Sequence, residues 1–485
     1  MKFTLTFEQS VLAAAALGAL AVVFFSPSLI LRYLKMIKLL RKKGKGIKLG
    51  RNHIEDQSRL RHTHIVGATG TGKTVLLEKL IEEDLKRGFG ALIIDPKGER
   101  EFYESVKNLC GWLGREKDLK LLSASFADES ASWNPCVLGS SSEVQTKFFN
   151  SAIYNEPHYA KACEYGLLRA IESLKSKKSQ FYLNDLTQEL EKISRAEKDQ
   201  TLQGLFYDLN NLLYGEWGSL LTPQNRTDTI SLLDIVKNNQ ILFVDLPTEG
   251  KRVQSSRIGR LLTQEIVLIS GMRKRDSSLK GGHPFSVFID EFDAFATESF
   301  ASFLNKGRSS EFMIHLAHQT LSDLNVISPE FAGQILGNCN VRFIFRQDDP
   351  DDAETWARFI GTKATVKETI KVQDGRRTGD ASLRETQEFV VSPDRIKSLA
   401  VGQCVLSIKT QGVNRTIQVP FRNQAKTKKK PKQNKLTHFE APQKEVAQIE
   451  VPQSQPPQIE HSQKDKAHGW DHVLSLVNHK QGVKT

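Results

Sequence analysis

Residues 63–81 read Thr63-His-Ile-Val-Gly67-Ala-Thr-Gly-Thr-Gly-Lys73-Thr74-Val-Leu-Leu-Glu-Lys-Leu-Ile81. A short apolar run leads into a glycine-rich turn, and a segment with the apolar spacing of a helix follows. This is the strand, loop and helix of a Walker A motif, G-x(4)-G-K-T. Glycines let backbone N–H groups close around phosphate oxygens, and the helix adds its positive N-terminal end. A chance glycine-rich turn is the alternative, but the full motif stands between the expected strand and helix.

The motif assigns the nucleotide contacts residue by residue. We expect Lys73 to reach the β and γ phosphates, and Thr74 to ligate Mg²⁺ through its hydroxyl. ATP and Mg²⁺ are therefore the predicted ligands. The predicted phosphate-binding loop consists of Gly67, Ala68, Thr69, Gly70, Thr71, Gly72, Lys73 and Thr74.

A P-loop enzyme also needs an acid near Mg²⁺ and a group that orients the attacking water, normally at the end of an apolar strand. The segment Pro284-Phe-Ser-Val-Phe-Ile-Asp290-Glu291 has this pattern. We predict that Asp290 contacts the metal and that Glu291 polarises water, although a pair of acids that only caps a strand would look the same. The run Ile241–Asp245 also ends in an acid, but no second carboxylate follows, so it is predicted to be a core strand of the same sheet.

A third strand, Gly90–Asp95, follows the Walker helix and completes a βαβ unit. It ends in the charged turn Pro96-Lys97-Gly98-Glu99. The carboxyl ends of parallel strands share one edge of a sheet, so Asp95, Lys97 and Glu99 are predicted to border the nucleotide, with a plain turn as the alternative.

A fourth strand, Phe312–Ala317, runs into His318-Gln319, a polar pair that could sense the γ-phosphate. Gln319 is interpreted as the sensor that links hydrolysis to motion. Arg308 lies eleven residues earlier. It could reach the nucleotide of a neighbouring subunit as an arginine finger, or it could form a surface salt bridge.

The order of these segments predicts an α/β fold, a P-loop domain with a mainly parallel sheet. Between residues 141 and 233 the strand patterns give way to helical spacing, which predicts an inserted all-α domain. Its Lys175-Ser-Lys-Lys178 stretch could touch phosphates or could be a solvated helix end. The predicted divisions are a membrane anchor at 1–49, the nucleotide-binding domain at 50–140 and 234–422, the insertion at 141–233 and a disordered tail at 423–485.

Residues 10–31 carry no charged side chain, and they are numerous enough to span a bilayer core of roughly 30 Å. We predict one transmembrane helix there, with a signal peptide or a buried helix as alternatives. Residues 32–62 hold eleven Lys or Arg against Glu55 and Asp56, which accounts for most of the net charge of +12. By the positive-inside rule the body is then cytoplasmic, on a membrane that the chain crosses once. The overall charge does not by itself indicate DNA binding.

Five scattered cysteines, with no CxxC pair, indicate reduced core thiols in a cytosolic body. Beyond Phe421 the chain turns to Lys426-Thr-Lys-Lys-Lys-Pro-Lys432 and then to a Gln- and Pro-rich run, which predicts a disordered tail. The amphipathic end, Trp470–Val477, could be a docking helix for a partner protein or a frayed end.

Six motifs, taken in order, resemble those of the type IV secretion coupling proteins of the TraD/TraG type: GATGTGKT, IIDPKGE, WNP at 133–135, VFIDE, GRSSEFMIHLAHQ and ILGNCNVRFIFR. The resemblance covers roughly residues 50–422. It implies a RecA-like motor that assembles as a homo-hexamer at the inner membrane and links processed plasmid DNA to a secretion channel. Members of this family commonly have two transmembrane helices, whereas this sequence shows one apolar span.

The resemblance implies a membrane-anchored ATPase that couples a plasmid's relaxase complex to a type IV secretion channel and drives DNA transfer in conjugation. The implied partners are relaxase and relaxosome proteins, channel components, the membrane, and DNA held through its backbone. A DNA translocase of the FtsK/HerA type and a protein-secretion ATPase remain alternatives. A non-catalytic scaffold that recruits substrates is a third alternative, which the filled hydrolytic positions disfavour.

Overall fold

The computed structural model describes residues 46–420, except 155, 198–199, 225 and 374–375. The predicted transmembrane helix at 10–31, most of the basic segment that follows it, and the predicted tail with its docking helix lie outside the described residues. No helix within the described residues has the length and apolar character needed to cross a membrane.

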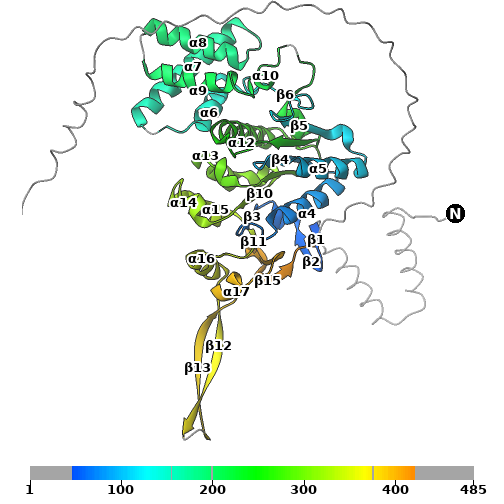
Figure 1. Ribbon diagram of the computed structural model, residues 1–485, viewed down its shortest axis with the longest axis vertical. Helices are drawn as coiled ribbons and strands as arrows, with labels where there is room; N and C mark the ends of the chain where they lie inside the picture. The colour runs from blue at the N-terminus through cyan, green and yellow to red at the C-terminus, as the bar shows by residue number, and fades with distance from the viewer. Residues whose placement is uncertain (1–45, 155, 198–199, 225, 374–375, 421–485) are drawn as a thin grey trace, which may run out of the picture. The chain divides into compact units, whose positions relative to one another are not determined.

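A nine-stranded sheet forms the centre of the described residues (Figure 1). Seven neighbouring strands run parallel, and two antiparallel strands extend one edge. The predicted α/β class with a mainly parallel sheet is therefore confirmed. In spatial order the strands are β15 (Val413–Gln418), β14 (Gln403–Ile408), β11 (Val341–Ile344), β3 (Thr63–Val66), β10 (Phe312–His318), β9 (Phe285–Ile289), β4 (Gly90–Asp95), β8 (Ile241–Asp245) and β5 (Leu119–Ser123).

Helices cover both faces of this sheet, which is why its parallel strands are almost continuously apolar. The longer helices are α4 (Lys73–Lys86), α5 (Arg100–Leu113), α12 (Arg252–Arg275), α13 (Glu298–Gly307), α15 (Pro329–Asn338) and α16 (Pro350–Ile360). The short helices are α3 (Asp56–Arg59), α11 (Leu232–Lys237), α14 (Leu321–Asn325) and α17 (Pro393–Lys397). Single 3₁₀ turns are η1 (Glu116–Asp118), η2 (Ser277–Lys280), η3 (Phe292–Ala294), η4 (Arg308–Ser310) and η5 (Lys409–Gln411).

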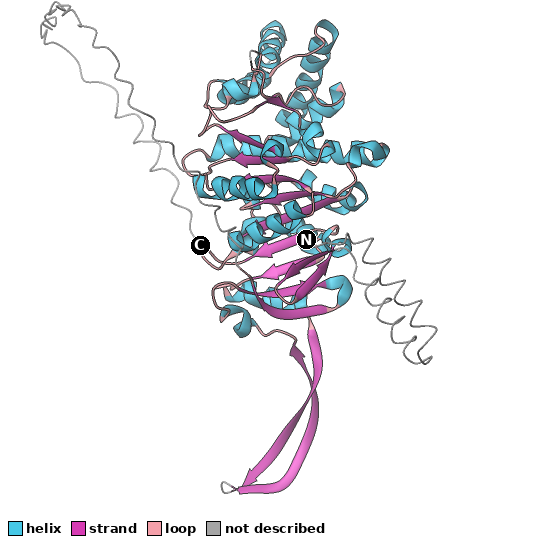
Figure 2. Cartoon of the chain, turned by 90° about the vertical axis from the view of Figure 1, so that its right-hand side faces the viewer, coloured by secondary structure: helices cyan, strands magenta, loops and turns pink. Residues whose placement is uncertain are grey.

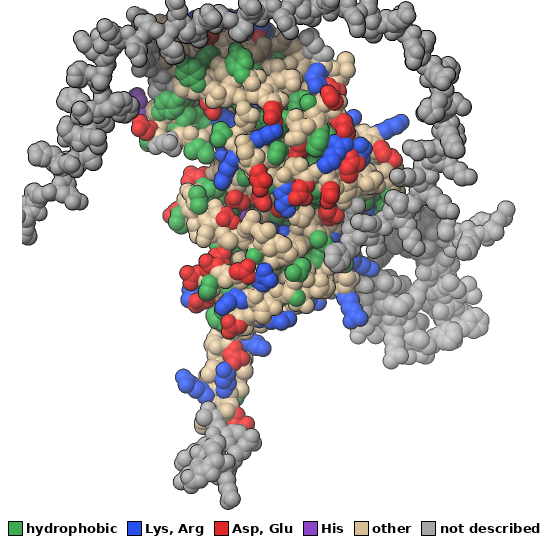
Figure 3. Space-filling model, viewed as in Figure 1, with side chains coloured by type: hydrophobic (Ala, Val, Ile, Leu, Met, Phe, Trp, Pro, Cys, Tyr) green, Lys and Arg blue, Asp and Glu red, His purple; other side chains and the backbone are tan. Residues whose placement is uncertain are grey.

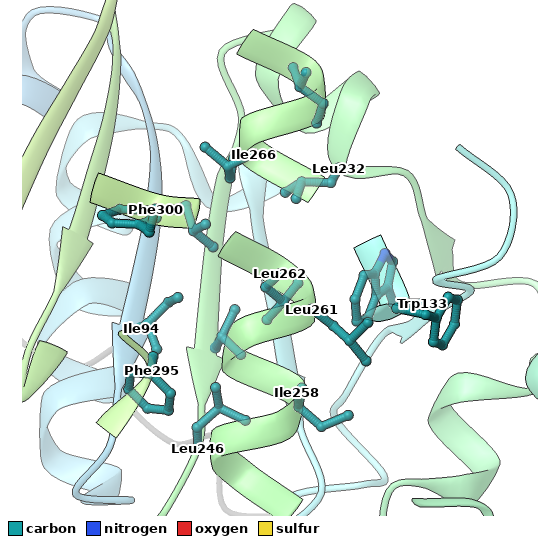
Figure 4. Close-up of a cluster of buried hydrophobic side chains, with 14 of the residues drawn as sticks. Ile94, Trp133, Leu232, Leu246, Ile258, Leu261, Leu262, Ile266, Phe295 and Phe300 are labelled. Atoms are coloured by element: carbon teal, nitrogen blue, oxygen red, sulfur yellow. The ribbon is translucent and has the colours of Figure 1, made fainter. Parts of the chain in front are cut away.

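The alternation of side chains along a strand divides the core into two layers. In β4, Leu92 and Ile94 join the cluster beneath α12, whereas Ala91 and Ile93 join the cluster beneath α4 and α5. Figure 4 shows the first of these clusters, in which Ile258, Leu261 and Leu262 of α12 lie among side chains from several other elements. Both clusters are almost free of solvent contact.

Residues 141–221 fold as helices, as the apolar spacing predicts. They are α6 (Ser141–Ser151), α7 (Pro157–Lys177), α8 (Leu183–Glu197), α9 (Gln200–Leu213) and α10 (Gly218–Leu221). Their buried side chains belong to the same hydrophobic cluster as β4, β8, β9 and α12. The helical segment therefore shares a continuous core with the sheet, and α6 packs directly on α12.

Three further pairs of strands lie outside the large sheet. They are the hairpin of β1 (Gly46–Leu49) and β2 (Asn52–Glu55), the parallel pair of β6 (Ser132–Trp133) and β7 (Thr229–Ile230), and the ribbon of β12 (Thr362–Gln373) and β13 (Arg376–Phe389). Figure 2 shows the long β12–β13 ribbon leaving the sheet and its helices. The ribbon inserts between α16 and α17, and no prediction anticipated it.

A buried ion pair between Arg59 of α3 and Asp84 of α4 connects these helices to strands β9 and β10. Both guanidinium nitrogens of Arg59 donate to the two carboxylate oxygens of Asp84, at 2.7 and 2.6 Å. Ser286 donates to the same carboxylate at 2.7 Å, and Arg59 Nη2 lies 2.9 Å from Nε2 of His315. The carboxylate has full hydrogen-bonding compensation for its burial, and the Arg59 guanidinium lowers the pKa of Asp84. This network fixes α3 and α4 against β9 and β10.

Candidate nucleotide-binding site

The glycine-rich loop joins β3 to α4 at the carboxyl edge of the sheet. Its backbone needs glycine at two places, since φ is 73° at Gly70 and 110° at Gly72. Gly67 is needed for a different reason, because a Cβ there would lie 2.4 Å from Cβ of Phe345. The loop is also pinned at both ends, as Ala68 N–H donates to the Arg346 carbonyl at 3.0 Å and Gly402 N–H donates to the Thr71 carbonyl at 2.9 Å.

Lys73, the first residue of α4, folds back over the loop. Its ammonium donates to the carbonyls of Gly67 at 2.5 Å and Ala68 at 3.2 Å. Burial lowers the pKa of Lys73, and the nearby Lys97 lowers it further, while Asp290 opposes the shift. The ammonium of Lys73, which is predicted to bind the phosphates, therefore lies inside the loop and is partly desolvated.

The predicted Mg²⁺ ligands face each other across two elements. Oγ1 of Thr74 lies 3.4 Å from Oδ2 of Asp290, which follows β9. The ammonium of Lys97 bridges them, at 2.8 Å from Thr74 Oγ1 and 3.3 Å from Asp290 Oδ2. A cation thus already joins the hydroxyl and the carboxylate, and these are oxygen donors of the kind that Mg²⁺ prefers.

The described residues contain no group of three His, Cys, Asp or Glu side chains that could hold a metal ion. One carboxylate and one hydroxyl fit the common magnesium site in which substrate phosphates and waters supply the remaining ligands. On this chemistry Thr74 and Asp290 would hold Mg²⁺ together with the nucleotide, not before it.

Glu291 adopts a backbone conformation that is rare for a residue with a side chain. Its φ is 41°, in the left-handed region, and its N–H donates to Oδ1 of Asp290 at 3.1 Å. Strain of this kind persists where the surrounding structure fixes it, and it collects at functional sites. Burial raises the pKa of Glu291, and the adjacent Asp290 raises it further, whereas a hydrogen bond from Gln319 lowers it.

The two residues of the polar pair at the end of β10 lie in different surroundings. Gln319 points to the loop, where its Oε1 accepts a hydrogen bond from Thr69 Oγ1 at 2.9 Å. His318 is fully buried and stacks on His64 of β3, so its side chain is not exposed at the loop surface. Burial lowers the pKa of His318 to about 4. Only Gln319 of the predicted pair is therefore placed to sense a phosphate.

Asp95 lies at the end of β4, beside Asp245 of β8 in the parallel register. Its Oδ1 accepts from the backbone N–H of Lys97 at 3.2 Å, while Oδ2 is buried with no hydrogen-bond partner within the described residues. Burial raises the pKa of Asp95 to about 7, with contributions from Asp290 and Asp245. Asp245 is buried in the sheet and accepts from Ser123 Oγ at 2.7 Å, as a core strand residue would.

Arg308 does not join these residues. It begins η4, which precedes β10, so a strand of seven residues separates it from Gln319. At a rise of about 3.3 Å per residue this is roughly 20 Å. Arg308 is solvent-exposed at the opposite edge of the sheet. The side chain cannot reach the nucleotide loop of its own subunit.

The sequence motifs assigned no role to the residues that hold the loop from β11 and β14. Phe345 and Arg346 follow β11, and Gly402 precedes β14, far along the chain from the Walker motif. At the surface, acidic and basic side chains are mixed over the face that Figure 3 presents. The geometry at the loop, and not a single-sign surface, is therefore the main indication of function.

Two family models match this chain in separate parts. The helicase HerA central domain matches residues 56–266, and the TraM recognition site of TraD and TraG matches residues 284–400. The first contains the nucleotide loop and the helical segment. The second begins at the strand that bears Asp290 and includes Gln319.

Among known proteins, the chain is 23% identical over 434 residues to the type 4 coupling protein DotL of Legionella pneumophila. The match covers 72% of this chain but 55% of DotL, so the chain spans about half the length of that relative.

The fold is also that of the bacterial conjugative coupling protein TrwB. The unbound form of TrwB has a TM-score of 0.64 and 17% identity, over 80% of this chain and 91% of TrwB. TrwB in complex with ADP and Mg²⁺ has a TM-score of 0.60 and 18% identity, over 79% of this chain and 91% of that one. The resemblance predicted from the six motifs is therefore confirmed.

Proposed function

Because the chain is a relative of the type IV coupling proteins and has a P-loop NTPase fold, we propose that it is an ATPase that couples DNA transfer to a type IV secretion channel. The observation that carries the catalytic part is the grouping of Thr74, Asp290 and Glu291 beside the glycine-rich loop, with Gln319 bonded to that loop. A protein that only recruited substrates would have no need for this arrangement.

In this proposal Lys73 leaves the carbonyls of Gly67 and Ala68 and binds the β and γ phosphates of ATP. Thr74 and Asp290 would hold Mg²⁺, which would supply positive charge to the same phosphates. Lys97 bridges those two side chains in the present structure, so it must turn away or bind a phosphate when the metal is held.

Glu291 then orients and polarises the attacking water. Its raised pKa makes it a better proton acceptor than an ordinary carboxylate, and its strained backbone fixes the direction of the side chain. Gln319 connects the end of β10 to Thr69 of the loop, so that loss of the γ-phosphate would change the position of β10. Asp95 closes the acidic side of the site.

The remaining parts of the proposal rest on the relationship to coupling proteins. The chain would act as a homo-hexamer at the bacterial inner membrane, with the predicted helix at 10–31 as the anchor and the body in the cytoplasm. Its partners would be relaxosome proteins, channel components and DNA. TrwB has been solved with an ATP analogue and with ADP and Mg²⁺, which supports the same ligands here.

A DNA translocase of the HerA type is the second candidate. The match to the helicase HerA central domain over residues 56–266 favours it. The match of residues 284–400 to the TraM recognition site favours the coupling protein. Transfer of a plasmid from cells that carry this chain as their single coupling protein distinguishes the two, because a HerA-type translocase would not support it.

The catalytic assignment predicts that Glu291→Gln binds ATP as tightly as the wild type but hydrolyses it at least about a hundredfold more slowly. Lys73→Ala should lose both properties, because its ammonium binds the phosphates. Lys86→Ala, on the same helix and paired with Glu82 at its end, is the matched control and should keep both. Hydrolysis by Glu291→Gln at the wild-type rate would exclude Glu291 as the group that polarises water.

A further inference from the structure

A second concave site lies away from the nucleotide loop, between the helical segment and the first turns of α12. It is a cavity of about 470 Å³, a size typical of sites for small ligands. Four elements form its walls: the connection from α6 to α7, the first turn of α7, helix α9, and the N-terminal part of α12. Nothing in the proposed ATPase mechanism uses it.

The charged residues that line this cavity are Arg252, Arg257 and Arg260, opposed by the single acid Asp208. Arg257 is 4% exposed, and its Nη2 lies 3.1 Å from Oδ2 of Asp208. Its Nε is buried with no hydrogen-bond partner within the described residues. Arg260 donates through Nε to the Ser151 carbonyl at 2.7 Å.

The two inner arginines are short of negative charge. Burial and the positive charge of Arg257 together lower the pKa of Arg260 to about 10. Burial also lowers the pKa of Arg257, although Asp208 opposes the shift. A buried guanidinium needs hydrogen-bonded compensation, and one half-exposed carboxylate supplies little of it. The cavity therefore favours an anion.

The rest of the lining combines apolar and aromatic side chains with the uncharged polar residues Asn211, Gln254 and Ser256. Tyr154 and Tyr159 form one wall, with ring centroids 6.2 Å apart. Tyr159 reaches close to α9 because residue 204 is glycine, since a Cβ at that position would lie 1.8 Å from the Tyr159 hydroxyl. The hydroxyl of Tyr154 is buried and, among the described residues, has no hydrogen-bond partner. At the rim, Ile153 and Val253 are 73% and 79% exposed.

We propose that this cavity binds an acidic peptide segment in which a carboxylate stands next to an apolar side chain. The carboxylate pairs with Arg257 and accepts from Tyr154, while the apolar side chain packs on Tyr159 and the exposed Ile153. A planar guanidinium recognises a carboxylate through two parallel hydrogen bonds, which suits a site with one deeply placed arginine.

The same chemistry argues against a nucleic acid backbone at this place. Non-specific DNA sites present exposed Lys and Arg along an open surface, so that successive phosphates are neutralised. Here Arg257 lies inside a walled cavity with tyrosine and aliphatic side chains at its mouth. One charged group on a flexible chain can enter, whereas a duplex cannot.

The test uses the full chain and fluorescent, blocked tetrapeptides with alanine at both ends. The central pair is phenylalanine, leucine or tryptophan followed by glutamate, and each peptide has a twin with glutamine in place of glutamate. We expect fluorescence anisotropy to show at least one glutamate peptide binding about tenfold tighter than its twin, the effect of a charge-assisted pair.

In Arg257→Gln the difference between the twins should shrink to less than about twofold. Arg275→Gln, an exposed arginine at the other end of α12, is the matched control and should leave the difference unchanged. Asp208→Asn should act in the opposite direction and tighten the glutamate peptides, because it removes the internal competitor for Arg257. Asp208 is exposed enough that this second variant should fold even if Arg257→Gln does not.

Equal affinity for the twins, including no binding by either, would overturn the proposal, as would weaker binding of glutamate peptides by Asp208→Asn. A single-stranded oligonucleotide whose affinity falls about tenfold in Arg257→Gln, while the twins bind equally, would assign the site to phosphate instead. These outcomes do not depend on ATP hydrolysis, so the proposed function and this inference can fail separately.

Discussion

Asp95 should make the stability of the nucleotide-free protein depend on pH. Its folded pKa of about 7 is above the ordinary value of 3.8 because the carboxyl is buried beside two other acids. Between these values the folded state keeps a proton that the unfolded state has released, so stability falls as pH rises through that window. Above about pH 7 the folded protein carries the full cost of a buried charge.

Asp95→Asn removes that cost while it keeps an acceptor for the Lys97 N–H. We expect the variant to gain on the order of 2 kcal/mol more stability at pH 8 than at pH 5, relative to the wild type. Thermal unfolding at the two pH values measures this. Asp394→Asn, whose side chain is 94% exposed, should show no such pH dependence. An Asp95→Asn effect of equal size at both pH values would contradict the assignment.

At the scale of residues, short motifs in the sequence predicted which side chains lie together at the loop, and their roles remain predictions. Thr74, Asp290 and Glu291 meet because the carboxyl ends of parallel strands share an edge, and that rule needs only the strand pattern. It could not predict that Phe345 and Gly402 hold the loop, because they approach it from distant parts of the chain. Nor could it predict that His318 turns inward while Gln319 turns outward, since this depends on the orientation of one strand.

At the scale of elements, a buried polar contact joins α6, β6 and α12. Glu265 accepts from Trp133 Nε1 at 3.1 Å and from Lys147 Nζ at 2.7 Å. The side chains of Lys147 and Glu265 are 1% and 3% exposed. Trp133, the first residue of the WNP motif, thus has a structural role in joining β6 to α12 beside the Lys147–Glu265 pair.

Glu265→Gln should destabilise the protein by about 3–5 kcal/mol, because it leaves the Lys147 ammonium buried without a counter-charge. Removing the ammonium as well, as in Lys147→Met with Glu265→Gln, should recover much of this loss, because the new amide oxygen can still accept from Trp133 Nε1. Chemical denaturation of the variants measures it. Glu216→Gln, which breaks the exposed pair with Lys251, should change stability by at most about 0.5 kcal/mol. If the double variant were no more stable than Glu265→Gln, buried charge would not be the cause.

The elements themselves were predictable where one face is apolar. Helical spacing predicted helices within residues 141–233, and helices α6–α10 lie at 141–221 of that range, where buried side chains recur at three and four residues. The β12–β13 ribbon was not predicted, because charged and polar side chains outnumber apolar ones in both strands, and no uninterrupted apolar alternation runs through either of them. Val366 and Leu383 are 62% and 74% exposed, and Lys367 pairs with Glu388 at 2.7 Å. The two divisions of the chain at 141 and 233 remain predictions.

At the scale of the whole molecule, the proposal of a multi-subunit enzyme rests on the position of Arg308. It lies on the edge of the sheet opposite the loop and is free to face another copy of the chain. If Arg308 completes a neighbour's site, Arg308→Ala should bind ATP normally but hydrolyse it at least about a thousandfold more slowly.

Mixing inactive Arg308→Ala with inactive Lys73→Ala then provides a direct check. Some interfaces in the mixed assembly pair an intact loop with an intact Arg308, so part of the hydrolysis should return. Arg358→Ala, an exposed arginine of α16 paired with Glu354, is the control that should stay active alone. No recovery on mixing would leave Arg308 as a surface residue.

The measurement that tests the coupling ATPase most directly is ATP hydrolysis by the full chain with and without DNA, at low and high salt, with Lys73→Ala as the control for contaminating activity. If the protein is a DNA-coupled ATPase, DNA should stimulate its hydrolysis of ATP, and high salt should remove the stimulation because the DNA is bound through its phosphates. Lys73→Ala should show no hydrolysis and no stimulation. Hydrolysis that is indifferent to DNA at every salt concentration would contradict the account and favour an ATPase that moves proteins.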